Sequence, residues 1–478
     1  MNDFHFADIH CHPNLKTYGH SFNESAEPDP RSNLWYHQSL TPARRLVKNI
    51  SGISAYSQAD FTAMSSGNVK LAFVSLYPFE KGFFINLTGS GGLSAISANL
   101  VTGIGYHRVR HLQRHLDYFQ DLEREYRFFC DGQRSAPVNG EERSWTMIST
   151  TRDLEEVMSA KNRMGVVLSI EGAHVFNTGL GMYGRRTDPD EVKERIRTVK
   201  DWAHPPVFIT FAHNFYNDLC GHARSLETLG PLVNQWEGLN DGFTDLGVNT
   251  LHELLSESNG APILVDIKHM SLKSRKLYFD ILKSDYGQAS WLPIIVSHGG
   301  ITGLKLDGGT TIAGAENLFY RADINFYDEE LVEISKSGGL FAIQLDKRRL
   351  ASRSFLQQAP ILATRRKVST GAILVWAQIQ HIAEVLDSHR LPAWDMVSIG
   401  SDFDGTINPP EGCLGSMDFS YLGMDLLKLA ENYMLQHRGT WKLPENGWID
   451  PGTILQKFGS GNAVSFLDRY FRAYKSLP

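Results

Sequence analysis

The chain has 478 residues, of which 42% are hydrophobic and 21% are charged, and its formal net charge is −6. This is the composition of a globular protein with a large core. The absence of a long basic run argues against nucleic-acid binding, and no apolar run is long enough to span a bilayer. Four scattered cysteines without a CxxC pair (Cys11, Cys130, Cys220 and Cys413) argue against a disulfide framework.

Strand and helix patterns alternate along the chain. Eight short, apolar runs are candidate strands: Phe4–Ile9, Val69–Tyr77, Met164–Ile170, Pro206–Phe211, Pro262–Ile267, Leu292–Val296, Gly339–Leu345 and Met396–Gly400. Helical patterns lie between and after them: Arg152–Ala160, Pro189–Trp202, Asn249–Ser258, Ser271–Leu282, Asp328–Ser337, Thr370–Asp387, Tyr421–Gln436 and Ala463–Tyr474. Eight strands separated by helices predict an α/β fold, namely a closed parallel TIM (β/α)8 barrel with additional C-terminal helices.

Two long stretches interrupt this alternation. Residues 14–57 are polar and predict a loop with one helix near Pro42–Asn49, and residues 81–105 are rich in glycine and serine. We expect a single barrel domain over residues 1–478, with insertions at about 14–57 and 81–142 that cover the active-site face.

The second insertion contains three histidines at helical spacing, which are either metal ligands or part of a charged surface. Residues His107–Phe129 have helical periodicity, and His107, His111 and His115 share one face of the predicted helix. This spacing can bind a metal ion, but several arginines are adjacent and no carboxylate or cysteine completes a ligand set. We therefore interpret these histidines as part of a solvated, charged helix face.

Most of the predicted strands end in a metal-ligating or acidic side chain. In a TIM barrel the C-terminal strand ends lie on one rim, where functional residues gather. Alternate residues of an extended chain point the same way, so the two histidines after the first strand can reach one point. The candidates, from six of the eight strands, are His10, His12, Glu171, His213, His269, His298 and Asp402. We expect them to meet in one pocket and to bind metal.

Four of these strand ends carry a family resemblance. The stretches Ser169-Ile-Glu-Gly-Ala-His174, Val265-Asp-Ile-Lys-His-Met-Ser271, Ile295-Val-Ser-His-Gly299 and Ile399-Gly-Ser-Asp-Phe-Asp-Gly405 together resemble the membrane (renal) dipeptidase family. This is peptidase family M19, within the amidohydrolase superfamily. The resemblance covers most of the chain, and the ordered set of four motifs is more specific than any one of them.

The resemblance implies a zinc-dependent dipeptidase with two zinc ions per chain. Glu171 would bridge the ions, with His10 and His12 on the first and His269 and His298 on the second. The residue chemistry agrees, because a carboxylate can share its two oxygens between cations and neutral imidazoles suit zinc. Two adjacent cations also lower the pKa of a bridging water, so that hydroxide exists at neutral pH.

The resemblance also implies roles for residues that do not bind metal. Asp402 would be the catalytic acid and base, and His213 would be a catalytic and substrate-binding residue that steadies the oxyanion. Asp404 is expected to be structural or to support a ligand, and His174 is not expected to be a ligand. Asp8 either orients a neighbouring group or caps the end of its strand.

The sequence departs from the family pattern at two places. The first motif of the family is usually His-x-Asp, whereas this chain has His10-x-His12, which leaves the site about one charge more positive. The family also uses an arginine soon after the sixth-strand histidine to bind the carboxylate of the substrate. The stretch Gly299–Gly314 contains Lys305 but no arginine, so Arg321 is the candidate for that substrate-binding role.

These features predict a metal-dependent hydrolase that cleaves an amide bond in a small molecule, with a dipeptide as the leading substrate and a hydroxide bridging two zinc ions as the nucleophile. The alternatives are another amidohydrolase reaction, on a cyclic amide, N-acyl amino acid or ester, and a non-catalytic metal-binding barrel. The resemblance further implies a homodimer. The first strand starts almost at Met1, so a cytoplasmic location is expected unless a leader has been removed.

Overall fold

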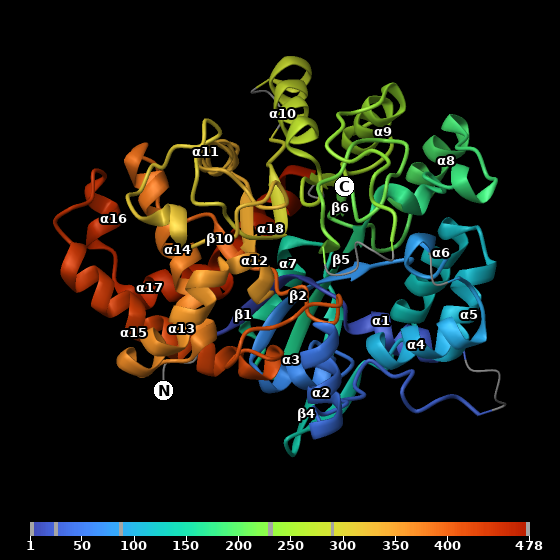
Figure 1. Cartoon of the computed structure of the whole chain (residues 1–478), viewed down its shortest axis with the longest axis horizontal. Coiled ribbons are helices and arrows are strands. Elements are labelled where there is room, and N and C mark those ends of the chain that lie inside the picture. Colours follow the sequence, from blue (N-terminus) through green and yellow to red (C-terminus); the bar gives the residue numbers. More distant parts are fainter. Residues whose placement is uncertain (1–3, 23–26, 86–88, 228–232, 288–290, 475–478) are drawn as a thin grey trace.

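The computed structural model describes residues 4–22, 27–85, 89–227, 233–287 and 291–474. Within them, eight parallel strands form a closed barrel (Figure 1). Its strands are β1 (Phe6–Cys11), β2 (Val69–Leu76), β5 (Arg163–Glu171), β6 (Phe208–Thr210), β7 (Leu264–Asp266), β8 (Ile295–Gly299), β9 (Leu340–Ile343) and β10 (Val397–Ile399). Each lies within or overlaps one of the eight predicted strands, so the predicted TIM barrel is confirmed.

The barrel closes through strands that are distant in sequence. Its strand order is β2-β1-β10-β9-β8-β7-β6-β5, and β2 pairs with β5 from Leu71↔Gly165 to Leu76↔Ile170. All eight residues of β2 are buried, because one face packs inside the barrel and the other packs against helices. Since all the strands run parallel, their C-terminal ends lie on the same rim.

A β-hairpin extends the sheet beyond the barrel and was not predicted. Strands β3 (Ser135–Val138) and β4 (Glu141–Met147) pair antiparallel, and β4 pairs parallel with the first half of β5. The connecting residues Asn139 and Gly140 have φ angles of 54° and 82°. Two consecutive positive φ angles are typical of the tight turn that an Asn-Gly pair favours in hairpins.

Helices surround the barrel in the order expected for this fold. Those after the barrel strands are α7 (Thr151–Ser159), α8 (Pro189–Lys200), α9 (Asp245–Leu255), α10 (Leu272–Ile281), α11 (Asp328–Lys336), α14 (Thr370–Ser388), α15 (Phe419–His437) and α18 (Asn462–Tyr474). Shorter helices are α3 (Phe61–Ser66), which precedes β2, and α12 (Lys347–Leu350), α13 (Arg353–Arg366), α16 (Pro444–Trp448) and α17 (Pro451–Gln456), which lie between the later helices. No helix in the described ranges combines the length and apolar character needed to cross a membrane.

The two long insertions are more helical than predicted. Helices α1 (Pro13–His20) and α4 (Gly92–Thr102) were not expected, whereas α2 (Pro42–Ser51) matches the predicted helix. The predicted helix His107–Phe129 is wrong as a single element, because the structure has α5 (Tyr106–Arg114) and α6 (Tyr118–Cys130). Residue His115 is extended, and the Asp117 side chain caps α6 by accepting from the backbone N–H of Gln120. In Figure 1, α4, α5 and α6 lie together on one side of the barrel.

Candidate metal centre

Four of the predicted site residues form a buried group at the rim of the barrel. His10 lies in β1, His12 follows it, Glu171 ends β5, and Asp402 follows β10. His10 Nε2 lies 3.4 Å from Glu171 Oε1, and His12 Nε2 lies 3.2 Å from Glu171 Oε2. Asp402 Oδ1 lies 3.5 Å from His12 Nε2. The ligand atoms of all four lie within 4.8 Å of one another, which is close enough to surround one metal ion.

A second buried group shares Glu171 with the first. His269 follows β7 and His298 lies in β8, and their Nε2 atoms are 3.2 Å apart. His298 Nε2 lies 3.7 Å from Glu171 Oε1. The ligand atoms of these three residues also lie within 4.8 Å of one another. The structure therefore brings the five predicted metal ligands together as two ligand sets that meet at one carboxylate.

The electrostatics of the site favour a bound cation. Burial disfavours a charged His12, but the negative charges of Glu171 and Asp402 outweigh it and raise the pKa of His12 to about 10. Burial alone would raise the pKa of Glu171, yet the surrounding histidines hold it well below its usual range. The same carboxylates that attract a proton to His12 attract a metal ion. Burial also lowers the pKa of His269 and His298 and keeps these imidazoles neutral, the form that binds metal.

The hydrogen-bond partners of the imidazoles test whether a metal ion fits. Buried polar atoms are almost always satisfied, so an orphaned ring nitrogen needs an explanation. Both ring nitrogens of His10, Nε2 of His12 and Nδ1 of His269 are buried without a hydrogen-bond partner. Metal coordination would satisfy the Nε2 atoms that face Glu171, and imidazole with carboxylate is a ligand set that suits zinc. The residues present therefore fit a pair of divalent cations.

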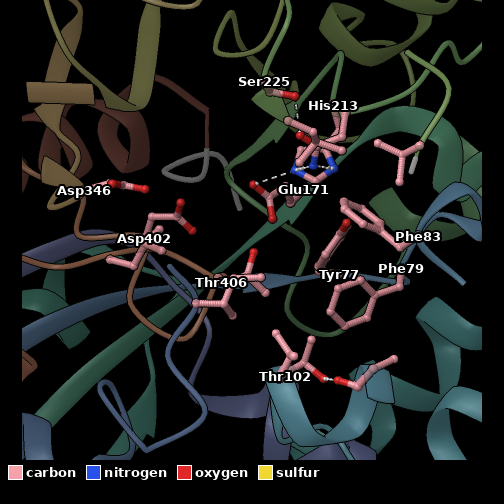
Figure 2. A pocket seen from close by; sticks show the side chains of 18 of the residues that line it. Tyr77, Phe79, Phe83, Thr102, Glu171, His213, Ser225, Asp346, Asp402 and Thr406 are labelled. Carbon is pink, nitrogen blue, oxygen red and sulfur yellow. Dashed lines mark hydrogen bonds and ion pairs between the residues drawn. The ribbon is translucent and has the colours of Figure 1, made fainter. Parts of the chain in front are cut away.

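His213 lies beside both groups and is held by a residue that sequence reasoning missed. Its Nε2 lies 3.2 Å from Glu171 Oε1 (Figure 2), and its Nδ1 lies 2.9 Å from both carboxylate oxygens of Glu80. Glu80 also accepts from the backbone N–H of Asn214 and from the hydroxyl of Tyr77. Burial opposes a charge on His213, but Glu80 and then Glu171 raise its pKa to about 10. Nothing in the motif pattern singled out Glu80, which comes from the loop after β2.

Asp402 is held in a strained conformation that aims it into the pocket. Its φ is 58°, and His269 has a φ of 66°, values that non-glycine residues seldom adopt. Gln344, which follows β9, donates to Asp402 Oδ2 at 2.7 Å, so Oδ1 is the oxygen that faces His12. The second aspartate of the motif, Asp404, points elsewhere and accepts from Lys16 and from the backbone of Ala59.

Two buried carboxylates tie the strands together beneath the ligands. Asp8 accepts from the backbone N–H of His10 and from Ser401 of the neighbouring strand end. Asp266 accepts from Thr210 and from both the backbone and hydroxyl of Ser297, and so joins β6, β7 and β8. Burial raises the pKa of Asp8 to about 6 and also raises that of Asp266. These two bridges fix the strands that carry the four ligand histidines and His213.

Three cationic side chains line the adjoining cavity, and Arg321 is not among its described lining residues. Arg321 is exposed on the loop after β8. Instead, Lys268 projects from the end of β7, and Arg348 and Arg349 come from α12 after β9. The loop after the sixth barrel strand, β8, thus contributes no described arginine to the cavity. The two arginines in the lining follow the seventh barrel strand, β9, where the sequence predicted no site residue.

His174, which was not expected to be a ligand, is not part of either ligand group among the described residues. Its Nε2 lies 2.7 Å from the carbonyl oxygen of Pro78, and its ring meets that of Tyr118 edge to face. His111 and His115 stack on each other with ring centroids 3.7 Å apart, and neither belongs to the two ligand groups.

Comparison with known proteins adds a fold assignment. No family model matches the chain. A dipeptidase described as a metallopeptidase of family M19 is 14% identical, with a TM-score of 0.51 over 98% of this chain and 99% of that one. A metallopeptidase from Rhodobacter sphaeroides, bound to a phosphinate mimic of the dipeptide L-Ala-D-Ala, is 15% identical, with a TM-score of 0.52 over the same shares. The chain has the fold of an M19 dipeptidase. The likeness spans nearly the whole chain, and the ligand groups described above lie on the rim of that fold.

Proposed function

We propose that this protein is a metal-dependent hydrolase of the M19 dipeptidase type, which cleaves an amide bond in a small molecule. The observation that supports it is the sharing of Glu171 between two buried ligand groups beside Asp402. His10 and His12 would hold one zinc ion, and His269 and His298 the other. When bound, the two ions would lower the pKa of a water molecule and polarise the amide carbonyl.

The protein's own residues would carry out the proton transfers. Asp402 Oδ1 would take a proton from the attacking water and deliver it to the leaving amine, while Gln344 fixes the other carboxylate oxygen. His213 would stabilise the negative charge that develops on the carbonyl oxygen, with Glu80 holding its ring in place and keeping it protonated. A dipeptide is the substrate class that the family resemblance implies.

The test combines metal content with turnover. The purified protein should carry two zinc ions per chain by elemental analysis and hydrolyse members of a dipeptide panel that includes D-residues at the C-terminal side. Glu171→Gln should lose metal and activity together, whereas His115→Gln, on the exposed side of the α5–α6 junction, should change neither. Two metals without turnover of any amide would refute the hydrolase proposal and favour a metal-binding barrel.

A further inference from the structure

The cavity beside the metal centre has two chemically different ends. Its volume is about 520 Å³, within the ~300–1,000 Å³ typical of sites for drug-sized ligands and large for the smallest dipeptides. Figure 2 shows Asp346 and Asp402 on one side, the aromatic rings of Phe79 and Phe83 on the other, and Glu171 between them.

One end, which we call the apolar arm, is built from the segment after β2 and from helix α4. It consists of Phe79, Phe83 and Phe84 from the segment after β2 and Leu93, Ala98 and Val101 from α4, whose Ser94, Ser97 and Thr102 add three hydroxyl groups to the lining. The ring of Phe79 meets those of Phe83 and Phe84 edge to face, with centroid distances of 6.1 and 5.3 Å, a favourable geometry for aromatic pairs. Helix α4 has no charged residue along its length. The apolar arm therefore suits an uncharged, hydrophobic group.

The opposite end is cationic. Arg348 is neutralised by a bidentate pair with Asp346, but neither Lys268 nor Arg349 forms an ion pair with a carboxylate in the described part of the chain. Lys268 Nζ donates to the carbonyl oxygen of Ile324 at 3.4 Å, and Arg349 donates to that of Ser225 and lies over the ring of Tyr320. Arg349, which stays charged, lies beside a centre that would hold two cations, and this favours an anionic group on the substrate to which Lys268 Nζ can also donate.

The carboxylates that line the cavity already interact with other side chains. Glu171 lies among the ligand histidines, Asp346 binds Arg348, and Asp402 accepts from Gln344. No acidic side chain among the described lining residues is left to pair with the ammonium group of a free dipeptide, and the apolar arm would desolvate that ammonium at a cost. The acyl side of the substrate should therefore carry no charge.

From this charge distribution we propose that the site takes N-acyl amino acids with a long apolar acyl group. The acyl chain lies in the apolar arm, the amide carbonyl lies at the metal centre, and the amino-acid carboxylate lies at Lys268 and Arg349. Water adds to the amide, the C–N bond breaks, and the products are a fatty acid and a free amino acid. This inference rests on the proposed hydrolase function and narrows its substrate class.

Chain length is the first test, and it needs no variant. For acetyl-, hexanoyl- and decanoyl-alanine, kcat/KM should rise about threefold to fourfold per buried methylene, so on the order of 100-fold from acetyl to hexanoyl. Replacing the carboxylate of hexanoyl-alanine with a carboxamide should lower kcat/KM about 10- to 100-fold, and Arg349→Gln should reduce that preference. A flat chain-length profile, or equal rates with the carboxamide, would overturn the proposal.

Binding provides a readout that is independent of turnover. By calorimetry, decanoate should bind the metal-loaded protein at least tenfold more tightly than acetate. Ala98→Trp, which fills the apolar arm, should lower that ratio and flatten the chain-length profile, whereas Ala43→Trp on the exposed surface of α2 should change neither. If the protein cleaves dipeptides and its rates on N-acyl amino acids do not depend on acyl chain length, this inference is refuted and the hydrolase proposal stands. Preferential decanoate binding without cleavage of any amide would refute the hydrolase function and leave the apolar arm in place.

Discussion

Glu125 gives the clearest prediction of how stability depends on pH. This carboxyl lies in α6, fully buried behind the metal centre, where it accepts from the backbone N–H of Tyr77 at 2.9 Å and contacts the side-chain amide of Asn14 at 2.5 Å. Burial, reinforced by the charge of Asp121, raises its pKa from 4.5 to about 8. A separation of 2.5 Å is short for N–H···O but ordinary for O–H···O, so a protonated Glu125 that donates to Asn14 Oδ1 fits the geometry.

The magnitude follows from the two pKa values. Because the folded-state pKa is above the unfolded value, the folded protein retains this proton, and the resulting stability is complete below pH 4.5 and lost as pH rises through about 8. One pKa unit corresponds to about 1.4 kcal/mol, so ionising Glu125 in the folded protein costs about 4–5 kcal/mol at alkaline pH. Glu125→Gln keeps both hydrogen bonds if the amide of Asn14 turns over, and it removes this cost.

The assay is urea unfolding at pH 5.5, 7.0 and 9.0 for the wild type and Glu125→Gln. The difference between the two midpoints should be smallest at pH 5.5, and the variant should be increasingly more stable than the wild type as pH rises. Glu156→Gln, an exposed carboxyl on α7, serves as the matched control and should follow the wild type at every pH. If the free energy of unfolding changes equally with pH in the wild type and in Glu125→Gln between pH 5.5 and 9.0, Glu125 is ionised in the folded protein and the reasoning is refuted.

Three further predictions concern the metal centre. Asp402→Asn should retain metal but lower kcat by about 10²–10⁴-fold, since it removes the proposed acid and base; an active Asn variant would reassign that role. Glu80→Gln should lower kcat with unchanged metal content, because it removes the charge that holds His213 protonated, and its pH–rate profile should lose activity at a lower pH than the wild type does; an unchanged profile would contradict this. His12→Asp adds one negative charge, so the acidic limb of its kcat/KM profile should move to higher pH, and identical limbs would exclude an electrostatic effect of the histidine.

The barrel could be predicted because each strand carries its own local signal. Buried parallel strands appear as apolar runs, and the residues at their ends then converge because the topology brings those ends to one rim. Glu171 and His298 are 127 positions apart in sequence, and no local pattern relates them; only the closed barrel does. The predicted convergence of the five metal ligands depends on this geometry.

The parts that were missed depend on contacts that a strand-end pattern does not contain. Glu80 reaches His213 from a loop, and Arg349 enters the cavity from a helix after a strand that carried no candidate. The prediction of Arg321 rests on its distance along the chain from His298, but loop paths do not preserve such spacing. The hairpin at Asn139-Gly140 is different: its turn dipeptide is a strong local signal for a hairpin, although the prediction for residues 81–142 contains no strand.

The bridges made by Asp8 and Asp266 have a consequence for how the protein acquires its metal. Each joins neighbouring strand ends by hydrogen bonds that involve no ion, so the imidazole-bearing backbone is positioned by the polypeptide itself. Metal ions should therefore bind to a preformed site, without the cooperative folding that accompanies metal binding in small zinc domains. Chelation ought to be reversible, leaving a folded apoprotein whose circular dichroism matches that of the loaded protein.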